Sequence, residues 1–185
     1  MSALTVLASL ILGAFAFTLI EYVHHWHGGH LGLFGARVRR SHQAHHRDPL
    51  EGGVRLATKY RQRAPLVLGV AAGIGGALAL IVGPAAAALI SAGMIGGYLH
   101  SERFHHAIHH RAPRGAWERF MWRYHYIHHF REGAANIGFT SPLWDLVFRT
   151  ARWDRSVVVP ERAVSPFAAE VPGVEVRRGR GADES

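Results

Sequence analysis

The sequence predicts an all-α integral membrane protein with about three transmembrane helices and a helical cap outside the membrane. Two observations predict this fold. Uncharged apolar runs are long enough to cross a bilayer as helices, and histidines recur at spacings that place them on one face of a helix. The 185 residues fit one domain with a core of ordinary size.

The first apolar run covers residues 2–20 and contains no charged residue. A helix of this length crosses the hydrocarbon core of roughly 30 Å. A secretory signal peptide is the alternative, but no Lys or Arg precedes the run, and Glu21-Tyr22 follows it in place of a small-residue cleavage site. We therefore expect a transmembrane helix that is retained.

The second apolar run, residues 64–99, has no charge and is too long for one span. Gly83-Pro84 near its centre supplies a turn between two spans. Because a hairpin returns the chain to the side it left, residues 21–63 and 100–150 are expected on the same side of the membrane. Residues 21–63 are rich in arginine, so the positive-inside rule makes that side cytoplasmic and gives the helical cap a cytosolic position.

The amino-acid composition limits the kinds of metal site and binding partner that the chain can have. The chain has 15 histidines, 3 methionines and no cysteine, which excludes disulfides, zinc ribbons and thiolate-held iron–sulfur clusters. Any metal is therefore held by nitrogen, with oxygen as a further option. The net charge of +8 does not indicate nucleic-acid binding, because the basic residues flank the apolar runs and form no aromatic-interleaved patch.

Two HxxHH repeats, at residues 42–46 and 125–129, are the main candidate metal-binding motifs. Positions i, i+3 and i+4 share one face of a helix, so each repeat is expected to direct its three imidazoles toward one point. A helix over residues 38–47 would end at Asp48-Pro49. Neutral imidazole is the commonest metal ligand in proteins, so these repeats predict a metal site.

Two looser pairs stand near the repeats. His105 and His109 are at i and i+4 and can bind one ion from one helix. His25 and His30 are about 140° apart on a regular helix, so both can face one ion only if the helix ends between them, at Gly28-Gly29. Ten ligands exceed what one ion binds, so the sequence predicts two metals. The candidate ligands are His25, His30, His42, His45, His46, His105, His109, His125, His128 and His129.

Other residues are weaker candidates. Some neighbouring histidines also have helical spacing and could replace ligands one step away: His24, His27, His106 and His110. His100 stands alone at the end of a span and is the least suited. Three carboxylates are candidates to orient imidazole N–H groups, or else to form ordinary ion pairs with arginines: Glu21, Glu102 and Asp145.

The order and spacing of these histidines resemble the fatty acid hydroxylase superfamily, which includes membrane fatty acid 2-hydroxylases, sterol desaturases and carotenoid hydroxylases. Glu21-Tyr22 and the segments 124–130 and 138–150 are similar to the 2-hydroxylase branch. The resemblance covers about residues 5–150. The chain departs from that branch in having one leading span, a shorter His30–His42 interval and no fused haem-binding cytochrome domain.

The resemblance implies a membrane-bound, non-haem di-iron oxygenase that uses O2 and the ten histidines to hydroxylate or desaturate a lipid. A fatty acyl chain is the first-ranked substrate, with a sterol or a carotenoid as alternatives in the same superfamily. Zinc can replace iron in purified samples.

Electrons must come from an external donor, such as a ferredoxin or a cytochrome. An acidic donor is expected to dock on cytoplasmic arginines, which would otherwise set topology and bind anionic lipid headgroups: Arg37, Arg39, Arg40, Arg111, Arg114 and Arg119. We expect an inner or cell membrane location, a membrane-embedded hydroxylase-like domain at residues 1–155, and a disordered tail at 156–185.

Two alternative functions belong to other classes. A histidine-rich metal transporter or storage protein would need ionisable ligands along its spans, and residues 64–99 have no ionisable side chain before Tyr98. A non-catalytic relative kept for lipid binding would have little reason to retain ten candidate ligands. Both alternatives rank below the oxygenase.

Overall fold

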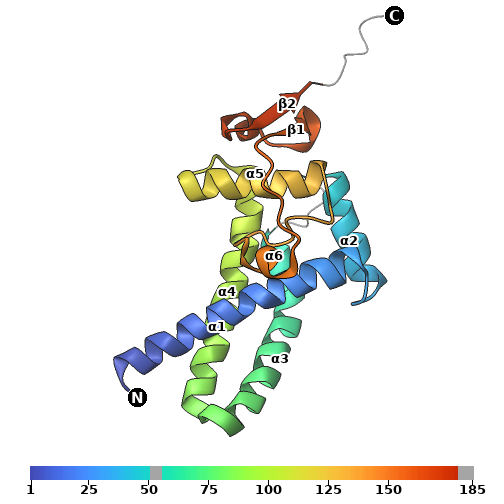
Figure 1. Ribbon diagram of the computed structural model, residues 1–185. Coiled ribbons are helices and arrows are strands. Elements are labelled where there is room, and N and C mark those ends of the chain that lie inside the picture. Colours follow the sequence, from blue (N-terminus) through green and yellow to red (C-terminus); the bar gives the residue numbers. More distant parts are fainter. Residues whose placement is uncertain (51–55, 179–185) are drawn as a thin grey trace, which may run out of the picture. The chain divides into compact units, whose positions relative to one another are not determined.

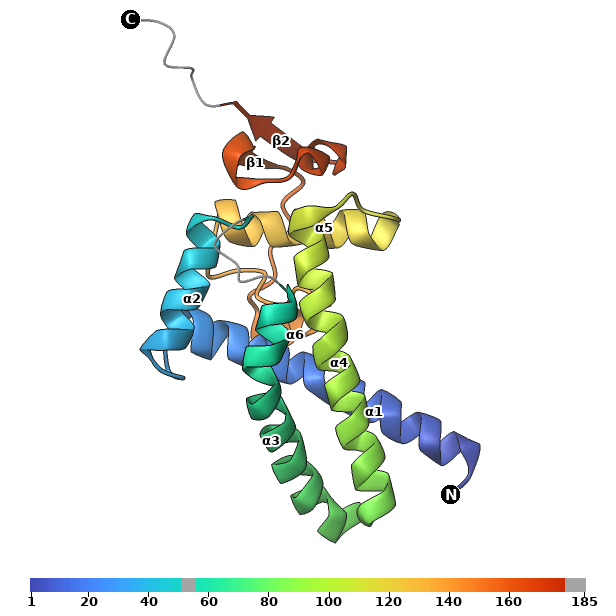
Figure 2. The ribbon, with the colours of Figure 1, turned by 180° about the vertical axis from the view of Figure 1, so that it is seen from behind.

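The computed structural model describes residues 1–50 and 56–178, which are mainly helical, as predicted (Figures 1 and 2). The chain divides into two compact units. The first contains Met1–Tyr22 and Val54–Arg103, and the second contains Val23–Gly53 and Phe104–Ser185. Helix α4 (Pro84–His110) contributes residues to both units.

The first unit consists of α1 (Ala3–Val23), α3 (Leu56–Val82) and the first part of α4. Gly83, with φ of 82°, separates α3 from α4, which confirms the predicted turn. Two stretches in the described part of the chain are long and apolar enough to cross a membrane, Ala3–His30 and Ala64–Val82. The third predicted span, at the start of α4, does not meet that criterion, so three spans stay a prediction.

Helices α1 and α4 approach closely at glycines. A Cβ atom added at Gly13 would collide with the carbonyl oxygen of Ile90, and one added at Gly93 would collide with that of Leu10. Small residues of this kind let helix backbones pack in contact where no hydrophobic effect drives them together. Glycine at these two positions therefore permits the close approach of α1 and α4.

The second unit contains all remaining elements and every one of the ten candidate ligands. Gly32 and Gly35 have positive φ values of 75° and 97° and separate its first two helices. Its elements are the π-helix η1 (His24–His30), α2 (Ala36–Arg47), the end of α4, α5 (Ala116–Phe130), α6 (Leu143–Phe148), strand β1 (Val157–Pro160), the 3₁₀ helices η2 (Glu161–Ala163) and η3 (Pro166–Glu170), and strand β2 (Val174–Arg177).

Helix α5 forms the centre of this unit's core. Its side chains Met121, Trp122 and Tyr126 are fully buried, and they belong to a cluster that also includes Ile108 of α4. The polar atoms of these two aromatic residues are hydrogen-bonded, since the Tyr126 hydroxyl donates to the Ile108 carbonyl at 3.0 Å and the Trp122 Nε1–H donates to the Arg111 carbonyl at 3.1 Å. This packing fixes α5 and the end of α4, the two helices that present five of the ten histidines.

The C-terminal segment differs from the expected disorder. Strand β1 pairs in parallel with β2, with Val157 opposite Val174, and β1 packs on α5 (Figure 1). Val157 and Val159 alternate into the core while Val158 is exposed. The prediction is wrong for residues 157–178, because a few apolar residues at alternate positions suffice when α5 is there to cover them. The rest of the expected tail, residues 179–185, lies outside the described residues.

Candidate metal centre

All ten predicted histidines gather in the second unit as two groups of five. The first group consists of His25, His30, His42, His46 and His128, and the second group consists of His45, His105, His109, His125 and His129. Within each group, one ligand nitrogen from every imidazole lies within 4.8 Å of the others. Five converging imidazoles make a nitrogen-lined site of the size of a single ion.

The Nε2 atoms face one another at close range. In the first group, the Nε2 of His30 lies 2.8 Å from that of His42 and 3.2 Å from that of His128. In the second, the Nε2 of His125 lies 3.1 Å from those of both His105 and His109. Two neutral imidazoles can hydrogen-bond at such distances only if one presents its N–H to the other.

Hydrogen bonds at Nδ1 decide which nitrogen faces the first group. The Nδ1 of His25 lies 2.5 Å from the Ile137 carbonyl, and that of His128 lies 2.8 Å from the Ala135 carbonyl. A carbonyl oxygen only accepts, so both Nδ1 atoms carry the proton and both Nε2 atoms present a lone pair. Lone pairs that converge repel unless a cation lies between them. The first group therefore fits a bound metal ion.

Burial keeps these imidazoles uncharged. Burial, followed by repulsion from nearby His30, lowers the pKa of His46 to about 4. Burial is also the largest cause that lowers the pKa values of His125, His128 and His129 well below the ordinary 6.5, followed by repulsion from neighbouring histidines. Neutral imidazole is the form that binds metal, so at neutral pH these four imidazoles are ready to bind without losing protons first.

A π-helix brings His25 and His30 together. Leu31 N–H donates to the carbonyl of Trp26 at 3.0 Å, five residues back, as in a π-helix. The wider turn places residues i and i+5 on one face, so the prediction that the helix ends between the two histidines is wrong. Gly29 has another role, because a Cβ there would lie 2.8 Å from Cγ of His42. The glycine makes room for a neighbouring candidate ligand.

Each HxxHH repeat divides its histidines between the two groups, which corrects the prediction that three imidazoles point to one ion. On α2, His42 and His46 belong to the first group and His45 to the second. On α5 the assignment is reversed, with His128 in the first group and the other two in the second. The i and i+4 positions stay together, and the i+3 position turns toward the adjacent group.

The two groups are neighbours. The rings of His46 in the first group and His129 in the second stack with centroids 4.2 Å apart and planes 17° apart. Phe139 covers both, since its ring stacks on His105 at 4.5 Å and meets His25 edge-on at 5.5 Å. Adjacent sites of this kind suit two metals that act on one molecule. Phe139 is a site residue whose role the sequence reasoning missed.

Asp145 organises the loop that orients His25 and His128. Its fully buried carboxylate accepts the N–H of Ile137 at 2.7 Å, the N–H of Gly138 at 2.8 Å and the Thr150 hydroxyl at 2.6 Å. Burial raises the pKa of Asp145, and these hydrogen bonds oppose the rise. The carboxylate thus acts on the loop's backbone, whereas the sequence left two other roles open, as the partner of an imidazole N–H or of an arginine.

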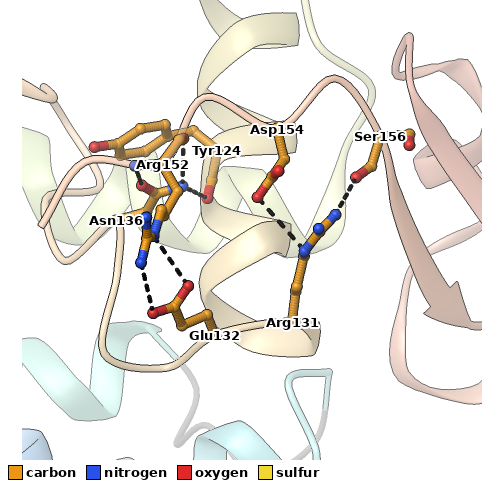
Figure 3. Close-up of polar contacts among 7 residues, drawn as sticks. All are labelled: Tyr124, Arg131, Glu132, Asn136, Arg152, Asp154 and Ser156. Carbon is orange, nitrogen blue, oxygen red and sulfur yellow. Dashed lines mark hydrogen bonds and ion pairs between the residues drawn. The ribbon is translucent and has the colours of Figure 1, made fainter.

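Asn136 holds the same loop from its other side (Figure 3). Its Nδ2 donates to the Tyr124 carbonyl of α5 at 3.0 Å, and its Oδ1 accepts the Arg152 N–H at 2.7 Å. The backbone of Asn136 is left-handed, with φ of 55°, a conformation that asparagine tolerates better than most residues. Sequence reasoning missed Asn136, for which the Asn-x-Gly pattern at residues 136–138 was the available signal.

Other candidates lie apart from the two groups. The rings of His106 and His110 stack on each other at 4.1 Å, and neither joins the ten, nor do His24 and His27. Glu21 accepts a hydrogen bond from Ser101 at 2.7 Å within the first unit. Among the predicted docking arginines, Arg111 is bound to Glu118 at 2.6 Å in a two-bond ion pair.

Known proteins are similar to this chain in sequence. The family model described as fatty acid hydroxylase matches residues 10–150. Two proteins of Arabidopsis thaliana are similar, the dihydroceramide fatty acyl 2-hydroxylases FAH2 (32% identical over 142 residues) and FAH1 (31% over 145 residues). The matches cover 75% and 76% of this chain. The chain spans 58% and 59% of the length of these relatives.

A solved structure titled full-length scs7p, in which only the hydroxylase domain is visible, has the same fold. The match has a TM-score of 0.64 at 24% identity and covers 83% of this chain and 58% of that one. The helices that present the two histidine groups therefore occur in a fold that is already known.

Proposed function

Because the chain belongs to the fatty acid hydroxylase family, we propose that it is a membrane-bound, non-haem di-iron oxygenase that hydroxylates a fatty acyl chain. The proposal depends on one observation above all, which is the convergence of ten histidines into two adjacent groups of five. In this proposal each group holds one iron ion, and the ten predicted histidines are the ligands.

The donor set favours this chemistry. Imidazole nitrogen suits iron, zinc and copper, and the ten residues include no thiolate. Iron in both groups would supply the redox chemistry that activates O2 toward an unactivated C–H bond. The protein's own residues keep the imidazoles neutral through burial, fix the tautomers of His25 and His128, and exclude water on one side with the Phe139 ring.

The substrate class follows from the relatives. Their names specify the fatty acyl chain of dihydroceramide, so a lipid-linked acyl chain is the first choice for this chain too. Hydroxylation inserts one oxygen atom of O2 into a C–H bond and reduces the other to water, which consumes two electrons and two protons. An external ferredoxin or cytochrome would supply the electrons, because the ten-histidine site has no carrier of its own.

The membrane setting belongs to the same proposal. The apolar helices would hold the protein in the inner or cell membrane, with the arginine-rich segments and histidine groups on the cytoplasmic side. We place the hydroxylase domain at residues 1–155, and the C-terminal strand β1 packs on its helix α5. Three spans would put the histidines where acyl chains leave the bilayer.

Isotope labelling tests the function. Membranes that contain the full chain are incubated with a ceramide-type lipid, a ferredoxin with its reductase, and heavy-isotope O2. We expect mass spectrometry to find one heavy oxygen atom in the acyl chain. The matched control is His42→Ala, which removes one proposed ligand. Loss of two hydrogens without oxygen would indicate desaturation instead, and no change in the lipid, with both metals bound, would contradict the substrate class.

A further inference from the structure

The two histidine groups differ in their access from outside. A pocket of about 550 Å³ is lined by four of the five imidazoles of the first group, His30, His42, His46 and His128. From the second group, among the described residues, only His129 lines it. A pocket of this size admits a small organic molecule.

The second group is more enclosed than the first, because three of its imidazoles are buried and two are half-buried, against two and three in the first group. His109 and His125 are 2% and 0% exposed, and the rings of Phe139 and His105 stack on each other. Ile108, beside His109 on α4, belongs to the fully buried core around α5. A molecule from solvent can reach His109 and His125 only after this packing opens, which requires local unfolding.

From this asymmetry we propose that the pocket is a metal-exchange port that serves the first site alone. Metal enters and leaves the first group through the pocket, and the second group exchanges its metal only on the slower timescale of local opening. The inference rests on the proposed dimetal function. It assigns a role to two pocket residues that are not among the ten candidate ligands, Gln43 on α2 and Gly133 after α5.

The physical basis is the pathway of ligand exchange. A chelator removes a metal by contacting it while the protein ligands leave one by one, so the rate depends on whether the chelator can approach. Gln43 is exposed, and a Cβ added at Gly133 would make ordinary contact with His30 at 3.6 Å. Larger side chains at either position would therefore fill the pocket without disturbing the core.

The test follows metal release from the detergent-purified full chain, loaded with zinc, into excess chromogenic chelator. We expect two phases of about one equivalent each, the fast one from the first group. His42→Ala should remove the fast phase and His109→Ala the slow phase. Gln43→Trp and Gly133→Leu should slow the fast phase at least about tenfold. Ser41→Trp, at an exposed α2 position that does not line the pocket, is the matched control and should leave both phases unchanged.

The possible outcomes distinguish failure of the proposed port from failure of the proposed dimetal function. Release of both equivalents in one phase, or a fast phase that Gln43→Trp and Gly133→Leu leave unchanged, would overturn the port and leave the dimetal proposal standing. A loss of the fast phase in His109→Ala would also overturn it, because the exposed site would then be the second. Metal content well below two equivalents before the chelator is added would overturn both.

Discussion

The first and second histidine groups use the same number of imidazoles but are held in place by different means. In the first, two imidazoles donate to backbone carbonyls of the loop at residues 135–137, and Asp145 and Asn136 hold that loop. In the second, the imidazoles of α4 and α5 are fixed by the packed core around Ile108 and Trp122. The first site depends on hydrogen bonds, and the second depends on packing.

The largest effect is expected when one ligand of either group is removed. His42→Ala in the first group and His109→Ala in the second should each lower turnover by at least about a thousandfold, because two metals that act as a unit fail together. For the same reason the double variant should be no worse than either single variant. Turnover is measured as hydroxylated lipid per chain. A double variant that loses the product of the two single losses would mean that the groups act independently.

The next effect is expected at the loop of residues 135–137, whose hydrogen bonds support the first group and not the second. Asp145→Ala leaves two backbone N–H groups and the Thr150 hydroxyl without their buried acceptor, so we expect a loss of stability of about 3 kcal/mol. The metal of the first group should be lost first, since His25 and His128 lose their orientation. Thermal unfolding in detergent and metal content measure the two effects.

The matched control for that variant is Asp154→Asn, which removes a partly exposed ion pair with Arg131 at 3.5 Å (Figure 3). Exposed pairs contribute less than about 1 kcal/mol, so stability and metal content should hardly change. Equal losses in the two variants would contradict the role assigned to Asp145.

A smaller effect is expected at the π-helix. Gly29→Ala places a methyl group 2.8 Å from Cγ of His42, so zinc binding by the first group should weaken about tenfold while the second group keeps its affinity. The control is Gly28→Ala, whose methyl group meets the exposed Phe34 ring, which can move away. Competition with a chelator of known affinity measures both. Equal weakening of zinc binding in the two variants would mean that it comes from substitution within the π-helix, and not from the loss of space beside His42.

A further effect concerns pH. In the metal-free protein the pKa of His46 is lowered from 6.5 to about 4, so between these values the unfolded chain binds more protons than the folded one. The stability present above pH 6.5 should therefore be lost progressively as the pH falls toward 4. Thermal unfolding of chelator-treated protein checks this, and His46→Asn should show a shallower loss. Greater stability on acidification would contradict the buried neutral imidazole.

Local spacing in the sequence was enough to identify the histidines that converge and the turn at Gly83. It could not show how each repeat divides between two groups, because that depends on where the partner helix places its own histidines. The sequence did not predict the π-helix for a related reason. On a regular α-helix, residues five positions apart lie about 140° apart and do not share a face. Only the observed register of η1 shows that His25 and His30 share a face.

The supporting residues were the hardest to predict. His25 and the Ile137 carbonyl are 112 positions apart, so no local pattern links Asn136 or Asp145 to the first group. Phe139 lies in the segment 138–150, which resembles the 2-hydroxylase branch. Its contact with three candidate ligands nevertheless exists only in the folded chain. Long-range contacts of this kind are set by tertiary structure and leave little trace in spacing.

Metal stoichiometry tests the central claim most directly. Plasma mass spectrometry on detergent-purified chain, prepared without chelators, should find two equivalents of iron or zinc in the unaltered protein. It should find one in His42→Ala or His109→Ala and none in the double variant. Less than about half an equivalent in the unaltered protein, or two equivalents retained in both single variants, would contradict a centre in which each histidine group holds one ion.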